Sequence, residues 1–166
     1  ENRVRLLEQV TRAVANAVGA DRTAVRLSPN GESYGVDDSD PAPLFMAVAK
    51  MLNDIGIAFL ELREPPPNGT FGATDVPRLS PLIRKHFKGP IILNSDYDMT
   101  RAQADLHSGL ADAISFGRPF LANPDLVERL QKGAPLNEDN METYYSQGAE
   151  GYTNYPTLAE SQAPLT

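Results

Sequence analysis

Cysteine is absent from this sequence of 166 residues. Its absence excludes a disulfide framework, a thiolate metal site and a cysteine nucleophile, and it removes the usual redox indication of the cell compartment. A cytoplasmic location is therefore the default expectation.

Positive charge is also scarce, because 15 Lys and Arg residues stand against 22 Asp and Glu residues, for a formal net charge of -7. No basic cluster stands out, so the composition disfavours a polyanion-binding surface. No apolar run approaches the roughly 20 residues of a membrane span, and the N-terminus lacks a basic segment followed by an apolar one. We therefore expect neither nucleic acid nor a membrane as a partner.

The chain is long enough for one domain, whereas a complete (β/α)8 barrel typically needs about 250 residues. It starts at Glu1 without an initiator methionine and enters a helical pattern at once. This start predicts a processed, split or truncated product whose upstream part is missing.

Helical and strand patterns alternate along the chain. Apolar residues at steps of three and four predict helices, with Gly19 and Gly56 suited to end the first two. Ser80 and Thr100 are the expected helix caps, and short apolar or β-branched runs predict strands. The expected helices cover residues 4–18, 44–55, 80–87, 100–107 and 126–131, and the expected strands cover residues 23–27, 57–62, 90–94 and 113–116.

This order predicts an α/β fold with a parallel sheet. The strands read as apolar on both faces, which is typical of a barrel covered outside by helices and packed inside. Four strands fit half of an eight-stranded TIM barrel. An open doubly wound sheet fits the strand count too, but its G-x-G-x-x-G motif is absent. We expect residues 1–133 to form half of a TIM barrel, and the polar, tyrosine-rich residues 134–166 to form a tail that lines or wraps it.

Active sites of such barrels lie at the C-terminal ends of the strands. Gly117 and Arg118 follow the last strand, where a residue without a Cβ allows close approach and a guanidinium donates charge-assisted hydrogen bonds. Asn94 and Ser95 end the preceding strand and offer backbone N–H groups nearby. These residues predict a phosphate site. The alternative is that Arg118 forms a surface ion pair and that Gly117 only makes a turn.

Arg26 lies within the first strand, where a guanidinium facing a barrel interior is costly without an acceptor. The electron-rich pyrimidine edge of a flavin would serve, and so would an ion pair with Glu61 or Glu64. Both readings stay open on position alone. In the tail, Tyr145 could present its ring to a ligand, whereas packing is the favoured role of Tyr144.

Asp37, Asp38 and Asp40 lack the glycine and the terminal glutamate spacing of a calcium loop. We therefore interpret them as a solvated loop, and no metal site is expected.

Six short segments occur in a fixed order that covers nearly the whole chain: Glu1-Asn2-Arg3-Val4-Arg5, Val25-Arg26-Leu27-Ser28-Pro29, Glu64-Pro65, Phe116-Gly117-Arg118, Asn123-Pro124-Asp125-Leu126, and Gly151-Tyr152 with Tyr155-Pro156. Together they resemble the C-terminal half of the old yellow enzyme family of FMN-dependent ene-reductases, in particular its bacterial N-ethylmaleimide reductase-like branch.

The resemblance implies a (β/α)8 TIM barrel to which this chain supplies the fifth to eighth strands. It implies that Arg26 contacts the pyrimidine edge of FMN. It further implies that the FMN phosphate is bound by Asn94 and Ser95 together with Gly117 and Arg118.

By the same resemblance Tyr145 lines the substrate pocket, and Asn2, Arg3 and Arg5 are structural. The family's substrate-binding His/Asn or His/His pair, its proton-donating tyrosine, and its threonine and glutamine contacts to the flavin belong to the first half. We therefore expect no catalytic residue in this chain. The segment 94–96 departs from the small Gly/Ala residues that often end the corresponding strand.

The resemblance implies an FMN-dependent NAD(P)H oxidoreductase that reduces activated C=C bonds by ping-pong hydride transfer, with NADPH or NADH as reductant. Its partner would be the N-terminal half of the same barrel. The alternatives are a non-redox phosphate-binding half-barrel or assembly module, and a barrel enzyme that binds a different phosphate compound. Because a half-barrel leaves strand edges and a core face open, we expect the isolated chain to dimerise, aggregate or pair with its complement.

Overall fold

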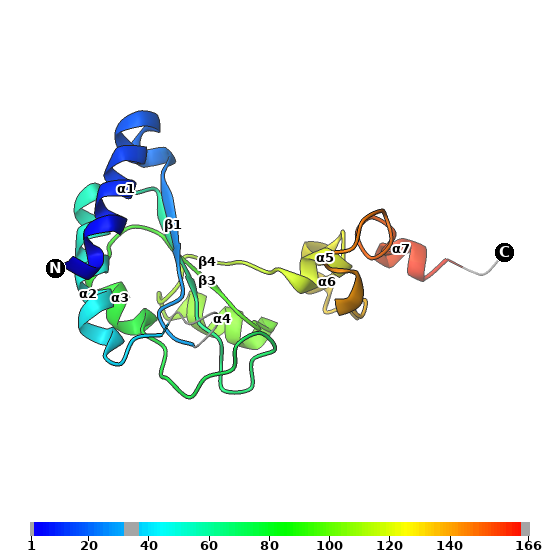
Figure 1. The fold of residues 1–166 in the computed structure, drawn as a ribbon. Helices are drawn as coiled ribbons and strands as arrows, with labels where there is room; N and C mark the ends of the chain where they lie inside the picture. Colours follow the sequence, from blue (N-terminus) through cyan, green and yellow to red (C-terminus); the bar gives the residue numbers. More distant parts are fainter. Residues whose placement is uncertain (1, 32–36, 164–166) are drawn as a thin grey trace. The chain divides into compact units, whose positions relative to one another are not determined.

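The structure is a computed structural model and describes residues 2–31 and 37–163. The chain forms two compact units, Glu1–Ser115 and Phe116–Thr166 (Figure 1). The division expected after residue 133, between a cofactor-binding half-barrel and a C-terminal tail, stays a prediction.

The first unit contains a four-stranded sheet in the order β1-β2-β3-β4, with every neighbouring pair parallel. Each strand follows a helix, as the alternating sequence pattern predicted. The strands are β1 (Ala24–Leu27), β2 (Phe59–Arg63), β3 (Ile91–Asn94) and β4 (Ala113–Ile114), and the helices are α1 (Asn2–Val18), α2 (Pro41–Ile55), α3 (Ser80–His86) and α4 (Met99–His107), with a short 3-10 helix, η1 (Ala20–Arg22), before β1.

The core lies between the sheet and its covering helices, which run side by side in Figure 1. Leu60 and Leu62 of β2 and Leu52 of α2 are fully buried, and Ile83 of α3 is 1% exposed. Full burial of such a side chain stabilises the fold by about 1.5–3 kcal/mol. These contacts fix the helices against one face of the sheet.

The expectation of strands that are apolar on both faces is wrong for β1 and β2. Along β2 the buried residues alternate with partly exposed ones, and the partly exposed set includes Glu61 and Arg63. In β1 the exposed residues are Ala24 and Arg26, between half-buried apolar neighbours. Arg26 and Glu61, which are partners in the parallel register, form an ion pair across the strands.

Both expected helix caps are also wrong. Leu79 precedes α3, and the N–H of Ser80 donates to the Glu64 carboxylate at 2.9 Å. At α4 the cap is Asp98, whose carboxylate accepts from the N–H of Arg101 at 2.7 Å. A carboxylate is a stronger acceptor at a helix start than a hydroxyl, because it also interacts with the helix dipole.

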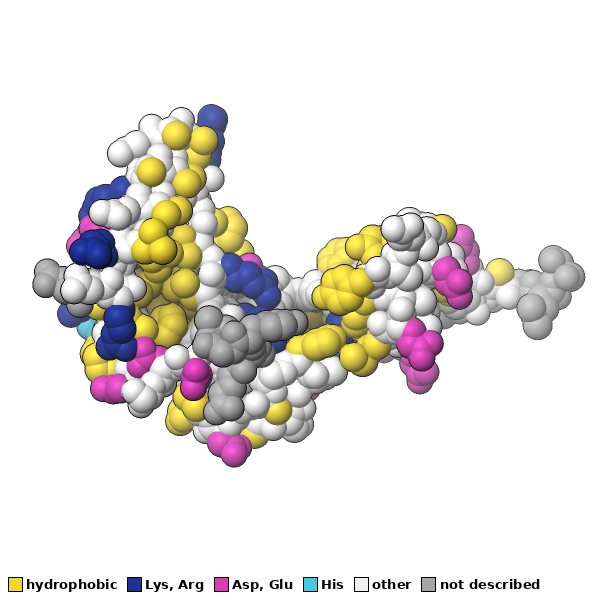
Figure 2. Space-filling model, in the orientation of Figure 1, with side chains coloured by type: hydrophobic (Ala, Val, Ile, Leu, Met, Phe, Trp, Pro, Cys, Tyr) yellow, Lys and Arg dark blue, Asp and Glu magenta, His cyan; other side chains and the backbone are white. Residues whose placement is uncertain are grey.

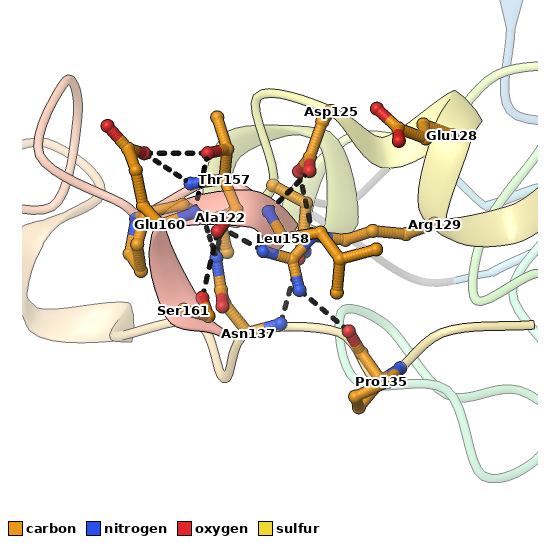
Figure 3. A network of polar contacts seen from close by, with 12 residues as sticks. Ala122, Asp125, Glu128, Arg129, Pro135, Asn137, Thr157, Leu158, Glu160 and Ser161 are labelled. Carbon is orange, nitrogen blue, oxygen red and sulfur yellow. Dashed lines mark hydrogen bonds and ion pairs between the residues drawn. The ribbon is translucent and has the colours of Figure 1, made fainter. Parts of the chain in front are cut away.

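The second unit holds short helices around a buried arginine. They are α5 (Arg118–Ala122), α6 (Leu126–Lys132), the 3-10 helix η3 (Met141–Thr143) and α7 (Leu158–Ser161), of which the sequence patterns predicted α6 alone. Arg129 is 2% exposed and donates to Asp125 at 2.7 Å and to the carbonyls of Pro135 at 2.7 Å and Pro156 at 2.9 Å (Figure 3). One guanidinium therefore ties three segments together.

Asp125 is a second centre of this hydrogen-bond network. Its carboxylate also accepts from the N–H of Leu158 at 2.6 Å, so it holds the start of α7 against α6. That N–H and the Arg129 guanidinium keep the pKa of Asp125 below its ordinary value. The motif Asn123-Pro124-Asp125-Leu126 thus has a structural role. Asn123 belongs to the same hydrogen-bond network, because its side-chain oxygen accepts from the N–H of Asn137 at 2.8 Å.

Candidate cofactor site

Three strands of the first unit, and the residue that follows the fourth, each contribute one side chain to a polar network on the face of the sheet without helices. Arg26 of β1 donates to Glu61 of β2 at 2.6 Å and to the side-chain oxygen of Asn94 of β3 at 2.8 Å. Just after β4, the Ser115 hydroxyl donates to Glu61 at 2.6 Å, and the Ser115 backbone carbonyl accepts from the Asn94 side-chain amide at 2.9 Å. We call these four residues the interstrand cluster.

The interstrand cluster identifies the ion-pair partner of Arg26, and the flavin contact stays a prediction. That partner is Glu61, the neighbour of Arg26 in the parallel register. Glu64 instead lies buried at the start of α3. The ion pair does not use up the guanidinium, which carries five N–H donors and gives two hydrogen bonds to the part of the chain that the structure describes.

The Arg26 side chain is 49% exposed, against 17% for Glu61. It therefore keeps donors directed away from its two partners, on the face of the sheet opposite the helices of the first unit. A fixed, half-exposed guanidinium suits an electron-rich, planar acceptor such as the pyrimidine edge of a flavin. The arrangement around Arg26 is thus compatible with FMN.

The loop after β3 has an uncommon backbone conformation. Ser95 has a φ of 99° and Asp96 a φ of 47°, a region that residues other than glycine seldom occupy. The loop is held by Arg101, which donates to the Ser95 carbonyl at 3.0 Å, and by the N–H of Thr70, which donates to Asp96 at 3.0 Å. Strain of this kind gathers at ligand sites, which agrees with the phosphate role predicted for Ser95.

A second cluster anchors this loop from α4. Arg78 donates both of its terminal nitrogens to Asp105 at 2.8 and 3.1 Å, and the Tyr97 hydroxyl donates to the same carboxylate at 2.7 Å. Arg101 lies over the Tyr97 ring, 4.2 Å from its centroid. Sequence reasoning missed this cluster because Arg78 and Asp105 lie far apart in the chain and only the fold brings them together.

The environment of this second cluster shifts the pKa values of Tyr97 and Asp105. Burial and the hydrogen bond to Asp105 raise the pKa of Tyr97. Burial by itself would raise the pKa of Asp105, but the hydrogen bonds from Arg78 and Tyr97 outweigh it, so the pKa is lowered. The carboxylate therefore stays ionised and holds Tyr97, a residue of the loop after β3, against α4.

Gly117 and Arg118 belong to the second unit, in which Gly117 precedes α5 and Arg118 begins it. A Cβ built on Gly117 would meet no atom within 4 Å among the described residues, so packing within the second unit does not require glycine there. Their joint phosphate site with Asn94 and Ser95 stays a prediction.

The two neighbouring tyrosines of the second unit differ sharply in exposure. Tyr144 is buried, which confirms its packing role, whereas Tyr145 is 97% exposed. An aromatic side chain so fully exposed contributes no packing within the described part of the second unit. Its role in a substrate pocket stays a prediction.

The acidic loop before α2 has a structural arrangement. Asp38 pairs with Arg3 and accepts from the N–H of Asp40 at 2.9 Å, and these contacts, led by the N–H, lower its pKa. The Arg3–Asp38 pair ties α1 to this loop, in line with the structural role expected for Arg3.

Among the residues described, no group of three or more acidic or histidine side chains could hold a metal ion, and no helix is long and apolar enough to cross a membrane.

Comparison with curated proteins gives relatives that extend beyond this chain. The 12-oxophytodienoate reductase 7 of Oryza sativa subsp. japonica is 38% identical over 178 residues, which cover 99% of this chain and 45% of the relative. A protein of Leishmania infantum named "Probable flavin mononucleotide-dependent alkene reductase" is 36% identical over 158 residues, which cover 95% of this chain and 42% of the relative. The chain spans about half the length of the curated relatives that it matches.

Solved structures share the fold as well. The old yellow enzyme homologue from Zymomonas mobilis is 58% identical and superimposes with a TM-score of 0.92, over 94% of this chain and 44% of that chain. Residues 1–137 match the model of the NADH:flavin oxidoreductase / NADH oxidase family, a family of FMN-dependent oxidoreductases that use a reduced nicotinamide. Because this match covers most of the chain, the chain belongs to that family and is a member of the old yellow enzyme family, as its sequence motifs implied.

Proposed function

We propose that this chain is the FMN-binding, C-terminal half of a (β/α)8 barrel that reduces activated C=C bonds, and that it supplies the fifth to eighth strands. The observation that carries the proposal is the half-exposed Arg26 guanidinium, held by Glu61 and Asn94 on the face of the sheet without helices. The parallel strands in chain order and the coverage of 44% of the Zymomonas mobilis structure support the half-barrel.

Bound FMN would supply the hydride chemistry, in a ping-pong cycle in which NADPH or NADH is the reductant and an activated alkene is the acceptor. Arg26 would bind the pyrimidine edge and stabilise the negative charge that reduction adds there. The loop residues Asn94 and Ser95, with Gly117 and Arg118, would bind the phosphate. This chain thus binds and orients the cofactor.

The substrate side depends largely on the other half of the barrel. Tyr145 would line the alkene pocket, and its exposure of 97% leaves its ring available for such a contact. The proton that completes the reduction would come from the remaining half, as the family resemblance implies.

The remaining half is the partner that the surface of this chain favours. Leu6, Val10, Val14 and Val18 recur every four residues along α1 and are exposed by 71%, 52%, 43% and 51%. Figure 2 shows hydrophobic side chains gathered over the part of the first unit where α1 and β1 lie. An apolar stripe beside an open strand edge favours a covering protein surface. The complementary half of the proposed barrel would bury it.

The test is to combine this chain with the complementary half and to measure flavin absorbance and FMN affinity. We expect a yellow complex, and we expect Arg26→Ala to weaken FMN binding or slow flavin reduction. Arg22→Ala is the matched control, because Arg22 is an exposed arginine of η1 outside the interstrand cluster. Unchanged binding and reduction in Arg26→Ala would contradict the role of Arg26. A colourless complex that binds phosphate alone would favour the non-redox alternative.

A further inference from the structure

In the function proposed above Glu61 only helps to hold Arg26, yet its carboxylate joins two other residues of the interstrand cluster. Its Oε1 atom accepts both from the Arg26 guanidinium and from the Ser115 hydroxyl, each at 2.6 Å. Its side chain is 17% exposed, so the carboxylate is largely withdrawn from solvent while it lies against Arg26. Attraction between the two charges is correspondingly less screened than on an open surface.

Holding Arg26 in place does not by itself require a second charge. Asn94 shows this within the same cluster, because its neutral side-chain oxygen accepts from the other terminal nitrogen of Arg26 at 2.8 Å. A glutamine at position 61 could also accept from Arg26. The carboxylate therefore adds something beyond a hydrogen bond, namely a negative charge that offsets part of the arginine's positive charge.

We propose that Glu61 is a positioning residue that fixes the Arg26 guanidinium and, by offsetting part of its charge, lowers the reduction potential of the flavin. The inference rests on the function proposed above. Reduction of the flavin takes two electrons and one proton and so leaves one added negative charge. Arg26 favours that charge, and Glu61 limits how strongly it does so.

The experiment measures the midpoint potential of FMN in the complete, FMN-loaded barrel, together with the affinity for oxidised FMN. Glu61→Gln keeps an acceptor near Arg26 and removes the charge. We expect the potential to become more positive by about 30 mV, which corresponds to a tenfold stronger preference for reduced over oxidised FMN. Glu8→Gln is the matched control, since it removes the same charge from an exposed ion pair of α1 with Arg12. We expect no shift in the control.

A second variant guards against a failure of Glu61→Gln to fold. Glu61→Asp keeps the charge but shortens the side chain by one methylene, so the carboxylate withdraws from Arg26. We expect a smaller shift in the same direction. In an Arg26→Ala background, Glu61→Gln should cause no further shift, because the residue acts through Arg26.

Two results would overturn the inference. One is a potential in both Glu61 variants equal to that of Glu8→Gln, while FMN still binds. The other is an equal shift from Glu61→Gln with and without Arg26, which would mean that the charge acts directly. Failure of the parent barrel to bind FMN at all would instead refute the proposed function, and this inference with it.

Discussion

Replacing Arg129 with methionine should destabilise the second unit by about 3 kcal/mol. The change keeps a long apolar side chain in the buried position but removes the three hydrogen bonds of the guanidinium. Hydrogen bonds to a charged group contribute about 1.5–3 kcal/mol each, so their sum is an upper limit. Two acceptors keep another donor, because Asn137 still donates to Pro156 and the N–H of Leu158 still donates to Asp125. The expected loss therefore lies at the lower end of the range for breaking a buried pair.

Amide hydrogen exchange over residues 116–163 measures this loss without assuming that the two units unfold together. A loss of about 3 kcal/mol lowers protection on the order of a hundredfold. Lys132→Met is the control on the same helix, since Lys132 makes an exposed ion pair with Glu128 and should change stability by about 0.5 kcal/mol or less. If Arg129→Met and Lys132→Met give the same protection, the guanidinium does not hold the unit together as described.

Two further predictions concern the loop after β3 and its anchor. Ser95→Gly should stabilise the chain by about 1 kcal/mol in urea unfolding, because glycine accepts the φ of 99° without strain; Ser108→Gly, at a φ of -74°, should be neutral or destabilising, and an equal effect of the two would refute the strain. The lowered pKa of Asp105 contributes stability that is present above the ordinary aspartate pKa of about 4 and is lost as the pH falls towards the folded value. Asp105→Asn should therefore lose less stability than the parent between pH 4 and 2, and parallel unfolding curves over that interval would contradict the assignment.

The sequence was sufficient for the order of the elements in the first unit. Gly19 and Gly56 follow α1 and α2 as expected, and the expected strands overlap β1 to β4 with errors of one to three residues. The faces of the strands could not be predicted equally well. A run such as Ile91-Ile92-Leu93 is apolar throughout, so it conceals the alternation that Leu60-Glu61-Leu62 displays in the neighbouring strand.

The candidate site was predictable only in part, because its contacts depend on strand register. Arg26 was identified, and Glu61 was one of its two possible partners. The hydrogen bonds that join Asn94 and Ser115 to that pair arise only once the parallel strands are aligned. Glu61 between two leucines was the available signal for a charged residue on the face without helices. The cap of α3 could not be predicted for a similar reason. The N–H of Ser80 donates to the carboxylate of Glu64, which follows β2 and is distant in the sequence.

The sequential strand order also determines how the sheet can assemble during synthesis of the chain. Each strand pairs with the next one to be made, so β1 and β2 can associate before β3 and β4 exist. The connecting segments cost similar loop-closure entropy, because a doubling of loop length adds only about 0.6 kcal/mol. Arg26 would therefore gain Glu61 first and Asn94 next, and its surroundings become final only when Ser115 arrives.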